Sequence, residues 1–158
     1  MENKNKLPLR VGVGIVLLNN DNKIFVGKRI DNPNNFWQMP QGGVDGNENF
    51  FDAAKRELEE ETGVKSIKLI KELNSWFEYQ LPGNLIGKIW KGKYSGLKQK
   101  WFVVKFIGKE NEINIKTIKP EFLDWKWIKP KELTELVVDF KLNVYKKIQN
   151  ELKSLNLF

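Results

Sequence analysis

Residues 42–64 read GGVDGNENFFDAAKRELEEETGV, and this stretch carries the clearest structural signal in the chain. The spacing of its apolar side chains predicts a helix from about Asn49 to Thr62. Gly63 follows directly, at the position where glycine commonly ends a helix. The apolar stripe expected to anchor this helix to the core consists of Phe50, Phe51, Ala54 and Leu58.

Acidic side chains crowd the second half of the predicted helix. Glu57, Glu60 and Glu61 are three and four residues apart, so their carboxylates share one helical face. Like charges at this spacing destabilise a helix, which makes the cluster unfavourable without a cation. Carboxylate oxygens in this number suit Mg²⁺ or Mn²⁺. Taken alone, the run also fits an ordinary solvated acidic face.

Composition limits the chemistry that the chain can perform. Its 158 residues include no cysteine and no histidine, which excludes disulfides, thiol nucleophiles, imidazole-based triads and the common zinc and iron–sulfur sites. Acid–base or metal chemistry must therefore use Asp, Glu, Lys, Tyr or the backbone. The formal charge of +7 favours a polyanionic partner, although a solvated lysine surface gives the same balance.

Length and hydropathy predict one domain over residues 1–158, with a core from about residue 9 to 150. Residues 1–10 are polar and basic and lack a signal-peptide pattern. The longest apolar run, residues 11–18, is far shorter than the roughly 20 residues of a membrane span. We therefore expect a cytoplasmic protein without a membrane partner.

The rest of the chain predicts an α+β fold, in which a mixed sheet carries the helix of residues 49–62 and a terminal helix. Gly12 and Gly14 leave one face of the first strand bare, so another group should pack closely there. Residues 31–35 are expected to form a loop, and the basic segment 82–100 a mobile loop over a site. The predicted strands are residues 11–18, 23–29, 67–73, 76–81, 101–107 and 123–128, and the terminal helix spans residues 138–155, with Val144, Ile148 and Leu152 on its buried face.

The spacing Gly42-x5-Glu48-x7-Arg56-Glu57-Leu58-x-Glu60-Glu61-x-Gly63-Val64 resembles the signature of the Nudix hydrolases, the Nudix box, here at residues 42–64. The resemblance implies an α/β/α sandwich with a central catalytic loop–helix–loop. It also implies cleavage of a diphosphate linkage attached to a nucleoside, with divalent cations held by the glutamates. In this setting Gly42 is expected to allow a tight turn, and Arg56 to hold the acidic array by bidentate pairing.

The resemblance continues outside the box. There the chain is similar to the RNA pyrophosphohydrolase branch of the family, whose members are also called (di)nucleoside polyphosphate hydrolases. The segments that carry it are residues 36–43, 99–102, 120–127 and 137–145. Two departures are the loop of residues 44–47, which lacks a frequent proline, and Lys28, where arginine is common. The branch implies removal of pyrophosphate from 5′-triphosphorylated RNA by metal-assisted attack of water.

Site residues follow from the resemblance at matched positions. Glu57, Glu60, Glu61 and Glu121 would bind Mg²⁺ or another divalent cation such as Mn²⁺, and Arg56 would support catalysis. Glu57 is the favoured general base, with Glu121 next. Arg29 and Phe140 would sandwich an RNA base, although Phe140 could instead simply fix its helix. The remaining residues expected at the substrate are Arg10, Gly42, Gly43, Lys100 and Lys141.

Each accessory assignment has a structural alternative. Trp101, Trp125 and Trp127 are expected in the core, and Lys141 could belong to a solvated face. A diadenosine polyphosphate hydrolase is the alternative enzyme, and a non-catalytic nucleotide- or RNA-binding Nudix module is the alternative of another class. The complete glutamate set argues against a pure binder. We expect a monomer that acts on triphosphorylated RNA or dinucleoside polyphosphates, with no DNA partner.

Overall fold

The computed structural model describes residues 7–31 and 34–158. The expectations for residues 1–6, and for residues 32–33 of the predicted loop, lie outside the described residues. The described strands are β1 (Leu9–Leu18), β2 (Ile24–Arg29), β3 (Trp37–Gln38), β4 (Gln41–Gly43), β5 (Ile67–Glu72), β6 (Phe77–Gln80), β7 (Gly96–Phe106) and β8 (Phe122–Ile128). The α-helices are α1 (Phe50–Thr62), α2 (Leu133–Leu136) and α3 (Leu142–Ser154), and the short 3₁₀ helices span Trp90–Gly92, Glu110–Glu112, Pro130–Glu132 and Asp139–Lys141.

The strands form one mixed sheet in the order β3-β2-β1-β7-β5, with β4 on β1, β6 on β7 and β8 on β2. β1 and β7 are parallel, from Leu9 opposite Gly96 to Leu18 opposite Lys105, and the other pairs are antiparallel. The predicted mixed sheet is therefore confirmed, and the first two strands, β1 and β2, form an antiparallel hairpin.

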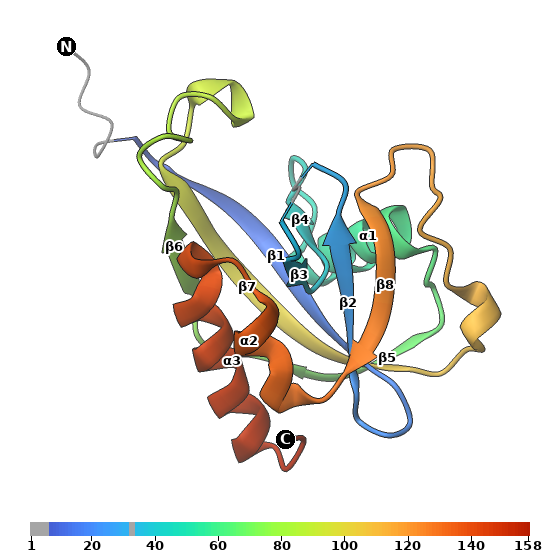
Figure 1. Ribbon diagram of the computed structural model, residues 1–158. Helices are drawn as coiled ribbons and strands as arrows, with labels where there is room; N and C mark the ends of the chain where they lie inside the picture. Colours follow the sequence, from blue (N-terminus) through green and yellow to red (C-terminus); the bar gives the residue numbers. More distant parts are fainter. Residues whose placement is uncertain (1–6, 32–33) are drawn as a thin grey trace.

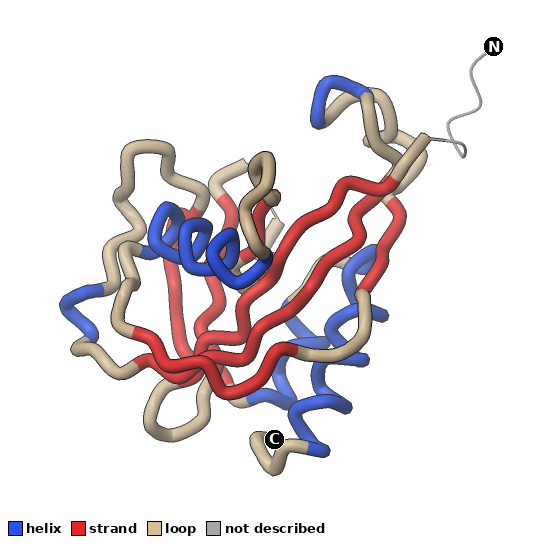
Figure 2. The backbone as a smooth tube through the Cα atoms, turned by 180° about the vertical axis from the view of Figure 1, so that it is seen from behind, coloured by secondary structure: helices blue, strands red, loops and turns tan. Residues whose placement is uncertain are grey.

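Helices cover both faces of the sheet, which confirms the α/β/α arrangement. Figure 1 shows α2 and α3 in front of the sheet, and the reverse view in Figure 2 shows α1 lying across the opposite face. On the α3 side the predicted stripe of Val144, Ile148 and Leu152 is buried. On the α1 side Ala54 and Leu58 pack into a second apolar cluster.

The sequence of α1 accounts for both of its ends. Asn49 precedes the helix in an extended conformation, and its side chain accepts a hydrogen bond from the Asp52 backbone N–H. Gly63 follows with a φ of 76°, and its N–H donates to the Glu59 carbonyl. These local signals explain why the predicted and observed boundaries of α1 agree so closely.

Two predicted segments differ from the structure. The predicted loop of residues 82–100 ends at residue 95, because β7 begins at Gly96 and pairs with β1 and β6. The predicted terminal helix of residues 138–155 is instead a 3₁₀ turn, Asp139–Lys141, followed by α3. Among the described residues, no helix is both long and apolar enough to cross a membrane.

Trp101 fills the space that Gly14 leaves open in β1, and the Gly42 carbonyl lies against Gly12. Its indole is fully buried, contacts the Tyr145 ring edge-on, and donates a hydrogen bond from Nε1 to Gln99 Oε1 over 3.2 Å. A Cβ at Gly14 would overlap this indole. The expected close packing against β1 and the core role of Trp101 are therefore confirmed, whereas Trp125 and Trp127 are only partly buried.

Gly14→Ala should lower the free energy of unfolding by about 1–3 kcal/mol, because the buried indole and strand cannot move apart without loss of packing. Gly83→Ala is the matched control, since no heavy atom lies within 4 Å of a Cβ placed there. Urea unfolding followed by tryptophan fluorescence measures both variants. Equal stability of Gly14→Ala and wild type would contradict this packing constraint.

Candidate active site

Two cavities open beside each other and share Arg29 and Gln41 in their walls. The larger has a volume of about 860 Å³ and lies between α1, β4 and the loop that precedes β8. The smaller has a volume of about 480 Å³ and lies between β3, the loop after β6 and the segment before α3. Their walls differ in chemistry, since the first is rich in charged groups and the second in apolar and aromatic ones.

The larger cavity gathers the four predicted metal-binding carboxylates. Glu57, Glu60 and Glu61 reach it from α1, and Glu121 reaches it from the residue before β8. The sequence separation of Glu121 from the others is closed by the pairing of β8 with β2, whose last residue, Arg29, also lines this cavity. The structure thus brings together all four residues that the resemblance assigned to one site.

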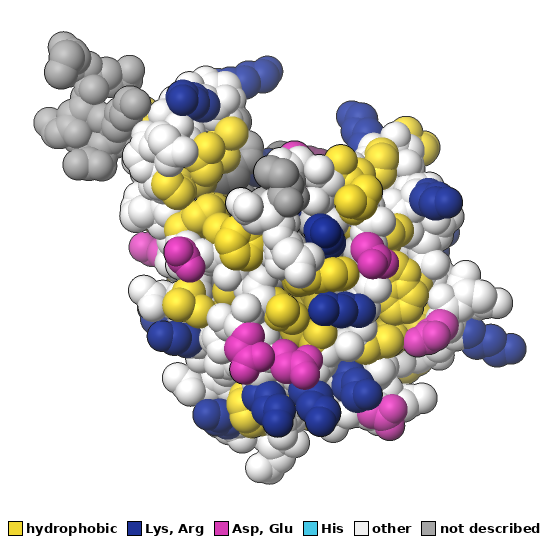
Figure 3. All heavy atoms as spheres, in the orientation of Figure 1, with side chains coloured by type: hydrophobic (Ala, Val, Ile, Leu, Met, Phe, Trp, Pro, Cys, Tyr) yellow, Lys and Arg dark blue, Asp and Glu magenta, His cyan; other side chains and the backbone are white. Residues whose placement is uncertain are grey.

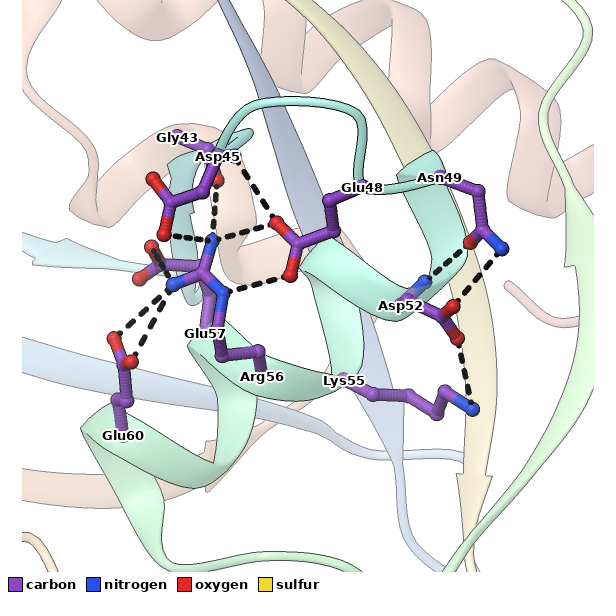
Figure 4. Close-up of polar contacts among 9 residues, drawn as sticks. All are labelled: Gly43, Asp45, Glu48, Asn49, Asp52, Lys55, Arg56, Glu57 and Glu60. Carbon is purple, nitrogen blue, oxygen red and sulfur yellow. Dashed lines mark hydrogen bonds and ion pairs between the residues drawn. The ribbon is translucent and has the colours of Figure 1, made fainter.

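Arg56 links the Nudix-box loop to α1, as Figure 4 shows. Its Nε and Nη2 donate to the two carboxylate oxygens of Glu48 over 2.9 and 3.0 Å, and Nη2 also donates to the Gly43 carbonyl over 3.0 Å. Nη1 donates to Glu57 over 2.9 Å and contacts Glu60 at 3.3 Å. The predicted hold on the acidic array is confirmed, and its bidentate partner is Glu48.

Charged side chains lie so close to Gly42 and Gly43 that neither position has room for a side chain. Gly42 lies in β4, paired with Val13, so the tight turn expected there is wrong. A Cβ at Gly42 would overlap the Glu57 carboxyl group, and one at Gly43 would lie 2.6 Å from Arg10 Nη2. Both glycines therefore leave room for charged side chains in the wall of the larger cavity.

Glu61 is a buried carboxyl group that Arg29 and the Gln41 backbone N–H compensate only in part. Its side chain is 6% exposed, and among the described residues its Oε2 finds no hydrogen-bond partner. Burial, reinforced by the nearby Glu57 and Glu121 carboxylates, raises the pKa of Glu61 well above its usual value. Burial also raises the pKa of Glu57, against the opposing effect of Arg56.

The carboxylate oxygens of the larger cavity are chemically suited to a divalent cation, but they do not converge on one point. In residues 7–31 and 34–158, no three acidic side chains converge closely enough to enclose a metal ion, and Glu57 and Glu60 turn to Arg56 instead. The cation site of Glu57, Glu60, Glu61 and Glu121 therefore stays a prediction. The buried Oε2 of Glu61 has no hydrogen-bond partner among the described residues, so a cation there would compensate its charge. Carboxylate oxygens are ligands that suit Mg²⁺ or Mn²⁺.

The smaller cavity contains both members of the predicted base sandwich, Arg29 and Phe140. Phe140 lies in the 3₁₀ turn before α3, with its ring centroid 5.7 Å from that of Tyr79. Lys141 lines the same cavity, is 5% exposed and donates from Nζ to Gln38 Oε1 over 2.8 Å. The solvated-face alternative for Lys141 is therefore wrong. Burial, with the nearby Arg29 charge, lowers the pKa of Lys141 to about 7.

Lys100 is the predicted substrate residue that the structure does not bring to either cavity. Its Nζ donates to the Asn74 carbonyl over 3.1 Å and lies 5.1 Å from the centre of the Trp76 ring. Arg10, by contrast, lines the larger cavity beside Gly43. Lys100 lies in β7, and its side chain contacts Asn74 and Trp76 in place of a cavity wall.

Arginine is scarce in this chain, and its positions coincide with the site. The chain has 27 basic side chains, of which only Arg10, Arg29 and Arg56 are arginines. All three line the larger cavity, whereas basic and acidic side chains are intermixed on the surface shown in Figure 3. Arginine offers a planar fork for phosphate and carboxylate groups that lysine lacks. All three were assigned to the site from the resemblance, and the structure brings them to one cavity.

Two further residues of the site had no role assigned from the sequence. Gln41 lies where the two cavities meet and donates from Nε2 to the Tyr79 hydroxyl over 3.1 Å. Asp31 lines the smaller cavity and pairs with Arg29. Gln41 lies in the segment of residues 36–43 that carries the resemblance but had no assigned role, and no motif marks Asp31, which is two residues from Arg29.

A family model described as NUDIX domain matches residues 8–148. This chain belongs to the Nudix family. A curated relative from Pelagibacter ubique (strain HTCC1062), named RNA pyrophosphohydrolase, is 60% identical over 154 residues, which cover 98% of each chain. A protein of the same name from Orientia tsutsugamushi (strain Boryong) is 43% identical and covers 96% of this chain and 94% of its own.

Solved structures support the same Nudix fold. The E. coli dihydroneopterin triphosphate pyrophosphohydrolase superposes with a TM-score of 0.68 at 21% identity, over 92% of this chain and 99% of its own. Together with the family match, this likeness confirms the predicted Nudix architecture. Nudix hydrolases generally use divalent metal ions.

Glu61→Gln should raise the melting temperature in EDTA at pH 7 by about 2–8 °C, because it removes a buried negative charge. A raised pKa in the folded state means that ionised Glu61 destabilises the fold, and that this cost disappears as the pH falls. Adding MgCl₂ or MnCl₂ should stabilise wild type and should stabilise Glu61→Gln much less.

Glu135→Gln, at an exposed position of α2, is the matched control for loss of one carboxylate. It should respond to metal like wild type. An equal metal-induced shift in Glu61→Gln, or a lower melting temperature of that variant in EDTA, would contradict the assignment of Glu61 as a cation ligand. Differential scanning fluorimetry gives both values without an activity assay.

Proposed function

We propose that this Nudix hydrolase removes pyrophosphate from 5′-triphosphorylated RNA and leaves a 5′-monophosphate end. The observation that carries this proposal is the junction of two chemically different cavities at Arg29. One cavity offers arginines and carboxylates suited to a cation-bound polyphosphate, and the other offers an aromatic pocket suited to a base. The two relatives named RNA pyrophosphohydrolase support the same substrate.

The larger cavity is proposed to hold the phosphates. Glu57, Glu60, Glu61 and Glu121 would bind Mg²⁺, or Mn²⁺ in its place, and Arg10 would contact phosphate oxygens. A bound divalent ion neutralises phosphate charge and lowers the pKa of an attacking water. Lys100 would take no part unless substrate binding moves it, since its ammonium group lies over Trp76.

Glu57 is proposed as the general base. Burial raises its pKa toward the working pH, which favours a group that must both accept and release a proton. Arg56 fixes its carboxylate, and the absence of a side chain at Gly42 keeps the space around it open. Glu121 is the second candidate, because it lines the same cavity.

The smaller cavity is proposed to hold a base of the RNA. Arg29 and Phe140 would contact its two faces, a stacking contribution of about 1–3 kcal/mol per base. Lys141 and Gln38 form a polar pair in the same wall and could meet the edge of the base. The net charge of +7 favours a longer anion than a single nucleotide.

The working unit is proposed to be a cytoplasmic monomer in which residues 1–158 form one domain, with no DNA partner. A dinucleoside polyphosphate could place one nucleoside in the same aromatic cavity, so it is the alternative substrate that the experiment must include. A non-catalytic Nudix module would bind these ligands without releasing products.

The test compares Mg²⁺-dependent turnover of triphosphorylated RNA of two or more nucleotides, diadenosine tetraphosphate and a nucleoside triphosphate at matched concentrations. RNA should have the highest kcat/KM and should yield pyrophosphate. Phe140→Ala should lower kcat/KM for RNA by about 5- to 150-fold, equivalent to the loss of one stacking contact, and should affect the nucleoside triphosphate less.

Phe158→Ala is the matched control, because Phe158 is half exposed and lines neither cavity. Faster turnover of diadenosine tetraphosphate, or equal losses on RNA and nucleoside triphosphate in Phe140→Ala, would favour the alternative hydrolase. Absence of metal-dependent product release from all three substrates would instead identify a binding module.

A further inference from the structure

The side chain of Arg29 is held by a neighbour that has no assigned role. Its Nε donates to Asp31 Oδ1 over 2.7 Å, and its Nη2 donates to Asp31 Oδ2 over 2.6 Å. This is a bidentate pair in which both carboxylate oxygens meet one edge of the guanidinium group. The Asp31 side chain is 65% exposed, so the pair lies at the open side of the smaller cavity.

The backbone around this pair is also fixed. β2 shifts register against β8 between Lys28 and Arg29, which re-aims the end of the strand. The Ile30 N–H then donates to the Glu121 carbonyl over 3.0 Å and ties the turn to the wall of the larger cavity. Arg29 Nη2 also lies 3.7 Å from Glu121 Oε2. Asp31 thus lies in a turn that the β2–β8 pairing and the hydrogen bond from Ile30 to Glu121 hold in place.

The geometry limits what Arg29 can bind. An arginine grips a phosphate most strongly through two parallel N–H donors along one edge. In Arg29 the edge formed by Nε and Nη2 already faces Asp31. The flat faces of the guanidinium group are not used by this pair, and a flat cation stacks well on an aromatic base.

We propose that Asp31 is a positioning residue that presents Arg29 as a stacking surface for a base and withholds its Nε–Nη2 edge from phosphates. The inference rests on the proposed function and deepens it, because it identifies a source of preference for RNA over free nucleoside triphosphates. Phosphate binding does not need this edge, since Arg10, near the start of β1, also lines the larger cavity.

Two outcomes of removing Asp31 follow. Asp31→Ala should lower kcat/KM for a triphosphorylated dinucleotide about tenfold, because the guanidinium group loses its fixed orientation. Turnover of a nucleoside triphosphate should stay constant or rise, because the released edge can bind phosphate. In an Arg29→Ala background, Asp31→Ala should have no further effect on either substrate, since Asp31 acts through Arg29.

A readout independent of activity is available because the chain has only three arginines. In an ¹⁵N-labelled sample, the Arg29 Nε–H signal should exchange slowly with solvent in wild type and quickly in Asp31→Ala. Arg29→Ala assigns that signal by its loss. Asp21→Ala, in the exposed turn between β1 and β2, removes the same charge and should leave both the spectrum and the substrate preference unchanged.

Retention of the wild-type RNA preference by Asp31→Ala would overturn the inference, as would an Arg29 signal that exchanges at the same rate in both proteins. Equal gains on both substrates that shrink with added salt would also overturn it, because Asp31 would then act only as a repelling charge. Failure of wild type to cleave triphosphorylated RNA would overturn the proposed function instead, and the exchange measurement would still report on the pair.

Discussion

The hold of Arg56 on the Nudix-box loop is the interaction on which the site depends. One guanidinium group contacts Glu48, Glu57, Glu60 and the Gly43 carbonyl, and so joins β4, the following loop and α1. Without the positive charge of the Arg56 guanidinium group, the acidic face of α1 and the loop carboxylates would repel one another at short range. The contacts of Arg56 therefore allow several carboxylates to lie close together in the wall of one cavity.

The charge balance of that cavity explains its need for a ligand. Arg56 compensates Glu48 and part of Glu57, but Glu61 lies deeper and its Oε2 has no partner among the described residues. Buried negative charge of this kind is tolerated where function requires it and is relieved when a cation binds. Destabilisation by Glu61 and its proposed role as a ligand are thus two consequences of the same burial.

Local signals made part of this structure predictable from sequence. Asn49, the apolar stripe and Gly63 define α1 through contacts within the helix, so its boundaries could be predicted closely. Features that depend on distant partners were harder to predict. Lys100 lies in a strand because β1 and β6 pair with its segment, and Lys141 is buried because Gln38 and the sheet surround it. The resemblance placed Arg29, Phe140 and Glu121 near the site and covered the segment that contains Gln41, whereas nothing in the sequence singled out Asp31.

The division of work between the two cavities is the central claim, and NMR of the arginine Nε–H groups and aromatic rings tests it directly. Pyrophosphate with Mg²⁺ should shift the signals of Arg10 and Arg56 and leave the Phe140 ring unchanged. A non-hydrolysable triphosphorylated dinucleotide should shift these signals and, in addition, those of Arg29, Phe140 and Tyr79. A dinucleotide that leaves Phe140 and Tyr79 unshifted while it perturbs the larger cavity would contradict the claim.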